Sequence, residues 1–360
     1  MKKEIETAQF WARETHTPLF TLTDPNKIEI QNTLILYNAG TSNFYYINQS
    51  EKIRSKKGYE YFSKESNFNK YIQETKLIIT KIQAFIKPTL KKNYKILTNI
   101  ELFNEFEITE NKILEFFQIY SQTEAYNFKK FENNFSKFNK DFEEIGKIRL
   151  EMRRLIKPLF TILIGKIIKE TAKRNNLNIE DTFFYTLNEI KDLFLNQKQI
   201  SKEILNSRKK GYCILVQENR YKIYTNKDYS EISKIIENKF SPKTKTLTGS
   251  VACQGKVIGI ARVIIQNKQN LKKELSKIKD GKIKDGEILV TDMTKPEMIT
   301  YCKKTSAIVT DEGGILCHAA IISREFNIPC IVGTKIATQL IKTGDKIEVD
   351  AIKGEIKKIN

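Results

Sequence analysis

The residues of this sequence best placed to do chemistry surround His318, one of only two histidines in the chain. Gly313 and Gly314 stand shortly before it, and glycine lets a backbone approach a ligand because no Cβ is in the way. We expect a helix to begin near Cys317 or His318. Its unpaired backbone N–H groups and the positive end of its dipole would favour a bound anion.

The same position favours a nucleophilic imidazole. The positive end of a helix disfavours the imidazolium form, so a ring nitrogen of His318 keeps its lone pair near neutral pH. A phosphorylated imidazole would be stabilised there by the backbone N–H groups. Spacing alone leaves a second interpretation open, in which His318 is a polar cap or a hydrogen-bonded buried side chain.

Local signals predict the elements that position His318. A strand over 307–310 leads into the glycine pair, and the following helix should end at Asn327 because Pro329 cannot continue it. Upstream, Thr294 has the character of an N-cap with Pro296 in the first helical turn. We therefore expect His318 to stand exposed on a first turn, with the helix burying Ala319, Ile322 and Phe326.

Glycine is distributed unevenly, with five of the 15 glycines before residue 240 and ten after it. This shift predicts two domains, residues 1–240 and 241–360. Apolar spacings of three and four over 71–195 predict a mainly helical first domain, with short β pieces at 33–47 and 212–224. The second domain should be β/α, so the fold class is α+β and multidomain. Its expected strands are 249–252, 256–266, 287–292, 307–310, 330–333 and 346–351.

The net charge of +19 invites a nucleic-acid interpretation, because basic surfaces gain affinity by releasing counterions from phosphate backbones. The charge is spread along the chain, however, and Lys heavily outnumbers Arg. The most basic and aromatic run, 44–62, comes with no RNA- or DNA-binding signature. We therefore expect no nucleic-acid partner.

No apolar run reaches the ~18 residues of a membrane span, and the polar start shows no signal-peptide core. We expect a cytoplasmic protein without a membrane partner. The five cysteines lack Cys-x-x-Cys spacing, so neither disulfides nor a metal site is expected. A thiol centre of Cys317 with Cys302 and Cys330 remains a minor alternative, since adjacent helical residues such as Cys317 and His318 diverge by about 100°. The second histidine, His16, is expected at the surface or in a cap.

The segment 310–325, Thr-Asp-Glu-Gly-Gly-Ile-Leu-Cys-His-Ala-Ala-Ile-Ile-Ser-Arg-Glu, resembles the swivelling phosphohistidine domain of the phosphoenolpyruvate-utilising enzymes. That family includes phosphoenolpyruvate synthase, pyruvate phosphate dikinase, rifampicin phosphotransferase and enzyme I of the sugar phosphotransferase system. The resemblance extends over 247–360 and continues upstream over 180–216, and it is much weaker before about residue 175. Two departures are Leu316, where the family commonly has Thr, and Cys253-Gln254, where it has Ser-Pro.

The resemblance implies that His318 is a phosphoryl carrier, with Gly313, Gly314 and Cys317 around the phosphate. It also implies an ATP-grasp domain and a phosphoenolpyruvate-binding barrel, and neither is expected in this chain, whose first 240 residues are poor in glycine. We therefore expect a phosphotransferase component that needs an ATP-grasp-type partner holding ATP and Mg2+. The acceptor would be pyruvate, phosphoenolpyruvate or another small molecule. The alternative is a non-catalytic regulatory or binding protein that retains the swivelling-domain fold.

Overall fold

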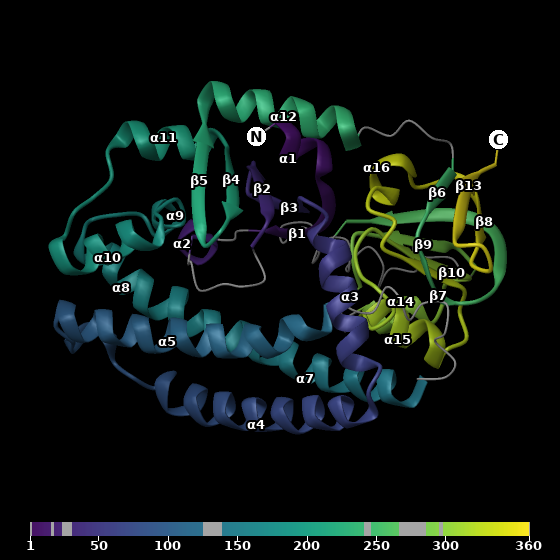
Figure 1. Cartoon of the computed structure of the whole chain (residues 1–360), viewed down its shortest axis with the longest axis horizontal. Helices are drawn as coiled ribbons and strands as arrows, with labels where there is room; N and C mark the ends of the chain where they lie inside the picture. Colours follow the sequence, from purple (N-terminus) through teal and green to yellow (C-terminus); the bar gives the residue numbers. More distant parts are fainter. Residues whose placement is uncertain are drawn as a thin grey trace. The chain divides into compact units, whose positions relative to one another are not determined.

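The structure is a computed structural model that describes residues 2–15, 18–23, 31–124, 139–240, 246–265, 286–294 and 298–359. These residues form a mixed α/β protein with two sheets, which divides into two compact units (Figure 1). Unit 1 comprises 1–53, 64–122 and 148–239, and unit 2 comprises 54–63, 123–147 and 240–360. The domain division at residue 240 stays a prediction, and His16 lies outside the described residues.

Unit 1 contains a five-stranded antiparallel sheet in the order β1-β3-β2-β4-β5. The loops of its two hairpins, Ala39-Gly40 and Glu218-Asn219, have positive φ at both residues, which matches the twist of the flanking strands. Both predicted β pieces are confirmed, whereas β1 was not foreseen. The strands are β1 (Gln9–Thr15), β2 (Thr33–Asn38), β3 (Thr41–Tyr46), β4 (Tyr212–Gln217) and β5 (Arg220–Thr225).

The helices of the first 240 residues confirm the predicted helical texture. Capping boxes start two of them, where Thr98 pairs with Glu101 and Thr186 pairs with Glu189. The unit 1 helices are α1 (Lys2–Thr7), α2 (Leu19–Leu22), α4 (Glu65–Thr89), η2 (Tyr94–Ile96), α5 (Asn99–Tyr120), η3 (Ser121–Thr123), η5 (Leu163–Ile168), α8 (Lys169–Arg174), α9 (Ile179–Thr182), α10 (Leu187–Asn196), α11 (Lys202–Lys210) and α12 (Asn226–Phe240). Helices α3 (Ser50–Phe62) and α7 (Asn139–Ile162) have residues in both units, and the last residue of η3 and of α12 also falls in unit 2.

Unit 2 contains an eight-stranded sheet in the order β6-β13-β12-β8-β9-β10-β11-β7. Its centre, β8 to β11, is parallel, and the outer pairings are antiparallel. The predicted strands are confirmed within a few residues, while β6 and β13 were missed. The strands are β6 (Thr246–Thr248), β7 (Ser250–Cys253), β8 (Lys256–Ile264), β9 (Ile288–Thr291), β10 (Ala307–Thr310), β11 (Cys330–Val332), β12 (Lys346–Asp350) and β13 (Glu355–Lys358).

Both faces of the parallel strands are covered, as their uninterrupted apolar sequences require. On one face, Leu289 and Ile308 pack with residues of α14 (Ile299–Cys302) and α15 (His318–Glu325). On the other, Ile288 and Val309 pack with Ala337 of α16 (Ala337–Leu340) and with β12 and β13. Helix α15 therefore has a fixed position on the sheet.

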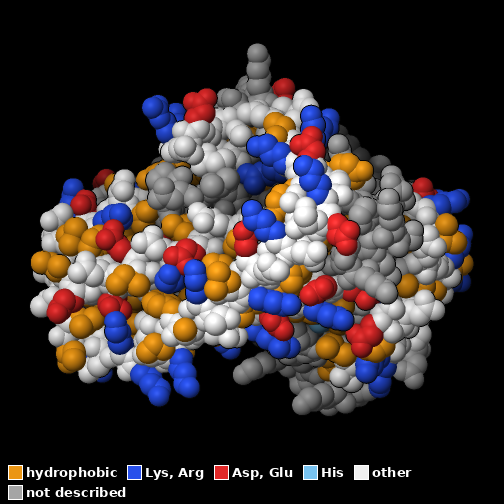
Figure 2. All heavy atoms as spheres, turned by 60° about the horizontal axis from the view of Figure 1, so that its bottom comes forward, with side chains coloured by type: hydrophobic (Ala, Val, Ile, Leu, Met, Phe, Trp, Pro, Cys, Tyr) orange, Lys and Arg blue, Asp and Glu red, His pale blue; other side chains and the backbone are white. Residues whose placement is uncertain are grey.

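Charge is mixed on the molecular surface. On the face shown in Figure 2, Lys and Arg side chains are interspersed with Asp, Glu and hydrophobic side chains. Among the described residues, no helix is both long and apolar enough to cross a membrane.

Candidate functional site

The site lies at one edge of the unit 2 sheet. Strands β9, β10 and β11 are neighbours and run parallel, so their carboxyl ends meet at the same edge. The loop after β9 carries Thr294, the loop after β10 carries residues 311–317, and β11 is followed by Gly333. This edge is where α/β sheets commonly bind ligands.

Asp311 fixes the loop after β10. Its backbone N–H donates to Thr291 O at 3.0 Å, which ties the loop to the end of β9. Its side-chain carboxylate is buried and accepts from Thr338 N at 3.0 Å, from Thr334 Oγ1 at 3.3 Å and from Thr338 Oγ1. An aspartate with several donors is held in one orientation, so the loop that precedes His318 is built on a rigid base.

The glycine requirement at Gly313 is steric. Its φ is +106°, and a Cβ there would lie 2.8 Å from Cys317 Sγ. Gly333 is constrained in the same way, because a Cβ on it would lie 2.9 Å from Gly313 O. Gly314 closes the turn by accepting from Cys317 N at 2.9 Å. The turn before Cys317 and the close approach of the loops after β10 and β11 therefore require glycine at positions 313 and 333.

Helix α15 begins at His318, as predicted, with Cys317 at the N-cap position and no capping hydrogen bond from the Cys317 side chain. It ends at Glu325, and Asn327 follows with a φ of +51°, in agreement with the expected stop before Pro329. The expected exposure of His318 is wrong, since its side chain is 5% exposed. Ala319 and Ile322 are buried in the core as predicted, and Phe326 packs against it partly buried.

Thr294 is the partner that the sequence interpretation missed. Its Oγ1 lies 2.9 Å from His318 Nδ1, and both side chains are buried. Helix α14 begins at Ile299 with Met298 at its N-cap position, and residues 295–297 lie outside the described residues, so the N-cap assignment of Thr294 stays a prediction. Pro296, expected in the first turn, lies outside the described residues. Local propensity predicts a cap role for Thr294. The contact with the His318 imidazole arises instead from the edge of the sheet, which local sequence does not show.

The thiol alternative is not supported by the environment of the cysteines. Burial raises the pKa of Cys302 to about 12 and raises that of Cys330 well above its usual value, so both are protonated thiols near neutral pH. Within the part of the chain that the structure describes, no group of three or more His, Cys, Asp or Glu side chains is arranged to hold a metal ion.

Arg324, six residues after His318, is largely buried on the same helix. Burial lowers its pKa, while Cys317, Cys330 and Glu143 act in the opposite direction. Its Nη1 donates weakly to Ala252 O at 3.4 Å. An arginine remains charged in proteins, so it adds a positive charge beneath α15.

Comparison with known proteins agrees with this geometry. Residues 283–354 match the family described as PEP-utilising enzyme, mobile domain. The match contains β9, β10 and β11, the glycine loop and all of α15. This stretch of the chain is therefore similar to PEP-utilising mobile domains. The phosphohistidine-domain resemblance seen in the sequence is therefore confirmed for the matched residues.

Curated relatives share this mobile domain. A probable phosphoenolpyruvate synthase of Archaeoglobus fulgidus is 46% identical over 108 residues, or 30% of this chain and 13% of the relative. The phosphoenolpyruvate synthase of Pyrococcus furiosus is 56% identical over 77 residues, or 21% and 9%. The chain therefore matches only about one eighth or less of the length of these synthases.

A rifampicin phosphotransferase of Bacillus cereus is 30% identical over 198 residues, or 53% of this chain and 21% of the relative. That match is longer than residues 241–360, so it reaches residues upstream of the mobile domain. Among solved structures, an enzyme I solution structure is 14% identical and covers 82% of this chain and 80% of its own, with a TM-score of 0.21. A TM-score this low does not establish a shared overall fold.

Proposed function

We propose that this chain is a phosphotransferase component in which His318 carries a phosphoryl group. The observation that carries the proposal is the placement of His318 in the matched mobile domain, at the first residue of α15, with Nδ1 against the Thr294 hydroxyl. The buried hydrogen bond argues against a simple cap, and since a structural buried histidine would also make it, the family match supports the carrier role.

The contact with Thr294 is compatible with a reactive Nε2. When Nδ1–H donates to Thr294 Oγ1, the lone pair resides on Nε2, which becomes the nucleophile. The Nε2–P bond forms as the P–O bond to the leaving group of the donor breaks, and the electron pair of that bond leaves with the donor oxygen. The proton on Nδ1 stays on that nitrogen and remains hydrogen-bonded to Thr294 Oγ1 throughout the step.

The phosphoryl group on Nε2 would be stabilised by the start of α15 and by the preceding loop. The first turn of a helix presents unpaired N–H groups and partial positive charge. Gly313, Gly314 and Cys317 form the turn that leads into that helix. In-line positioning and charge neutralisation are the main requirements of phosphoryl transfer, so no further covalent group is needed.

The donor and the acceptor belong to the same proposal. The synthase relatives motivate an ATP-grasp-type partner that binds ATP and Mg2+ and phosphorylates His318 in trans. The acceptor would be pyruvate, phosphoenolpyruvate or another small molecule, and the rifampicin phosphotransferase match motivates the last of these. The mobile domain would swivel between the two sites, and the chain would act in the cytoplasm.

The burial of His318 favours a second candidate function. A side chain that is 5% exposed must become accessible before its Nε2 can meet a donor, and a permanently closed site would suit a non-catalytic regulatory or binding protein. The two candidates differ in whether Nε2 ever takes up a phosphoryl group.

Labelling of the full chain tests the proposal. The chain carries His16→Ala, so that His318 is its single histidine, and is treated with potassium phosphoramidate, a small histidine-phosphorylating reagent, and separately with ATP, Mg2+ and a phosphoenolpyruvate synthase whose own histidine has been replaced. Intact mass should show one added phosphoryl group that is stable in base and labile in acid, and His318→Ala should remove it. An unlabelled parent chain in both treatments, or full labelling of His318→Ala, would overturn the carrier assignment.

A further inference from the structure

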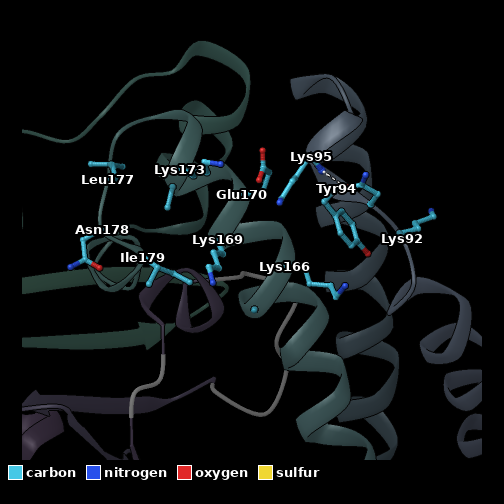
Figure 3. Close-up of a pocket in the computed structure, with 13 residues that line it drawn as sticks. Lys92, Tyr94, Lys95, Lys166, Lys169, Glu170, Lys173, Leu177, Asn178 and Ile179 are labelled. Atoms are coloured by element: carbon cyan, nitrogen blue, oxygen red, sulfur yellow. Dashed lines mark hydrogen bonds between the residues drawn. The ribbon is translucent and has the colours of Figure 1, made fainter.

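A basic pocket lies in unit 1, formed by two separate segments. One segment is 92–95, around η2, and the other is 165–179, which includes η5, α8 and the start of α9. The cavity has a volume of about 660 Å³, within the usual range for small-molecule sites. Figure 3 shows lysines that reach the pocket from both segments: Lys92, Lys95, Lys166, Lys169 and Lys173.

The acidic residue that lines this pocket does not neutralise the positive charge of the lysines. Glu170, the single acidic residue of the lining, accepts from Arg174 Nε at 3.0 Å. Lys92 is paired with Glu105 at 2.5 Å. For Lys95, Lys169 and Lys173 there is no ion pair with any described residue. Several uncompensated cations around one cavity attract an anion that carries more than one charge.

The walls are held rigidly. Arg174 donates to Tyr94 O at 3.1 Å and to Asn99 Oδ1 at 2.9 Å, so it clamps the 92–95 segment against the end of α8. Tyr94 is buried, and Lys166 Nζ lies 6.0 Å from the centre of its ring. A site that is already organised loses little conformational entropy when a ligand binds.

The helix that carries three of the lysines is locally irregular. Residues 163–168 form a π-helical turn, and Lys169 N donates to Ile164 O across five residues. Turns of this type are rare and occur frequently at functional sites. Gly165 lies on this turn and lines the pocket without contributing a side chain.

Part of the lining is apolar. Leu177 and Ile179, both partly exposed, lie among the lysines (Figure 3). A purely inorganic anion would leave these groups unused, whereas a phosphate ester with an organic portion would use both kinds of surface.

We propose that this pocket binds a small phosphate ester with two or more negative charges and an apolar portion, of the size of a nucleoside diphosphate. Every lining residue belongs to unit 1, whereas His318 belongs to unit 2. The proposal is therefore independent of phosphohistidine chemistry, and either of the two can fail alone.

The test is calorimetric titration of ADP, without Mg2+, into the full chain carrying His318→Ala, which removes any phosphoryl transfer. We expect saturable binding with a Kd below about 1 mM, weaker binding of inorganic pyrophosphate, and a decrease in affinity with salt. Lys169→Gln with Lys173→Gln should weaken ADP binding on the order of tenfold. A matched double variant, Lys81→Gln with Lys202→Gln, removes the same charge from exposed positions outside the pocket and should change the affinity little.

A second pair of variants changes the space inside the pocket without changing its charge. A Cβ at Gly165 meets only Thr161 Cγ2, at an ordinary 3.6 Å, so Gly165→Ala should bind ADP normally. The larger side chain of Gly165→Leu should extend into the cavity and abolish binding with no change in charge. Absence of ADP binding to the parent chain, equal weakening by both lysine pairs, or full binding by Gly165→Leu would each overturn the proposal.

Discussion

The Thr294 hydroxyl oxygen lies 2.9 Å from Nδ1 of His318, and the two side chains come from loops that follow neighbouring parallel strands. The contact orients the imidazole ring, and where Nδ1–H is the donor it leaves the lone pair on Nε2. It also joins residues that are 24 positions apart in sequence. The chemistry proposed for His318 therefore depends on the pairing of β9 with β10.

Replacing Thr294 by Val keeps the shape of the side chain and removes the hydroxyl. The loss of one hydrogen bond of about 1 kcal/mol should slow phosphoryl uptake by His318 roughly five- to tenfold. Uptake is measured as the initial rate of labelling by phosphoramidate over a range of pH, because loss of the Nδ1 partner should also shift the pH profile. Thr294→Ser retains the hydroxyl and should label at nearly the wild-type rate. Equal rates for Val and wild type would show that the contact does not act on the imidazole.

His318→Ala should also destabilise the protein, contrary to what an exposed first-turn residue would suggest. The imidazole is buried, and its loss leaves the Thr294 hydroxyl without this partner, so we expect a loss of about 1–3 kcal/mol. Urea unfolding measures this loss. His318→Gln can still reach a hydroxyl with its amide, so it should be less destabilising while remaining unlabelled. Wild-type stability in His318→Ala would indicate that the side chain is not packed in solution.

The site was partly predictable because its signals are local. A histidine that follows a glycine pair and precedes helical apolar spacing and a proline indicates the start of a helix even when the fold is unknown. The contact between Thr294 and His318 could not be found in this way, since it depends on which strands are neighbours. The same applies to Asp311, whose partner Thr338 lies 27 residues away.

The strands, too, were predictable only where their signals are local. The β pieces at 33–47 and 212–224 and the central strands of the unit 2 sheet were predictable from turn residues and apolar runs. Strand β1 was missed because Gln9–Thr15 does not alternate between apolar and polar residues. It becomes a strand by pairing with β3. Strands β6 and β13 likewise pair with each other at the sheet edge, where neither sequence is strongly apolar.

The steric account of Gly313 predicts a large effect of adding one methyl group. Gly313→Ala would need a φ of +106° and would place Cβ 2.8 Å from Cys317 Sγ. Gly286 provides the matched control, since its φ is +92° and nothing lies within 4 Å of its Cβ position. Gly286→Ala should therefore cost about 1 kcal/mol from backbone conformation alone, and Gly313→Ala should cost more and slow labelling of His318. Unfolding midpoints and labelling rates that are the same for both variants would contradict this account.

The ion pair between Glu189 and Arg208 in unit 1 predicts how stability depends on pH. Arg208 Nη1 and Nη2 donate to the Glu189 carboxylate at 2.6 and 3.0 Å. Burial would raise the pKa of Glu189, but these bonds and those from Thr186 outweigh it and hold the pKa below the usual 4.5. A carboxyl with a lowered folded-state pKa contributes stability that is present above pH 4.5 and is lost as the pH falls through the folded value.

Glu189→Gln removes that contribution and leaves the buried Arg208 without its charge partner. We expect the variant to be less stable than wild type at pH 7, by about 1–3 kcal/mol, and the difference to shrink as the pH falls below 4.5. Urea unfolding at pH 7 and near the lower end of the stable range measures both values. Glu231→Gln, at an exposed position on α12, should differ little from wild type at either pH. If the Glu189→Gln difference stayed constant or grew on acidification, the lowered pKa of Glu189 could not be the cause of its stabilising effect.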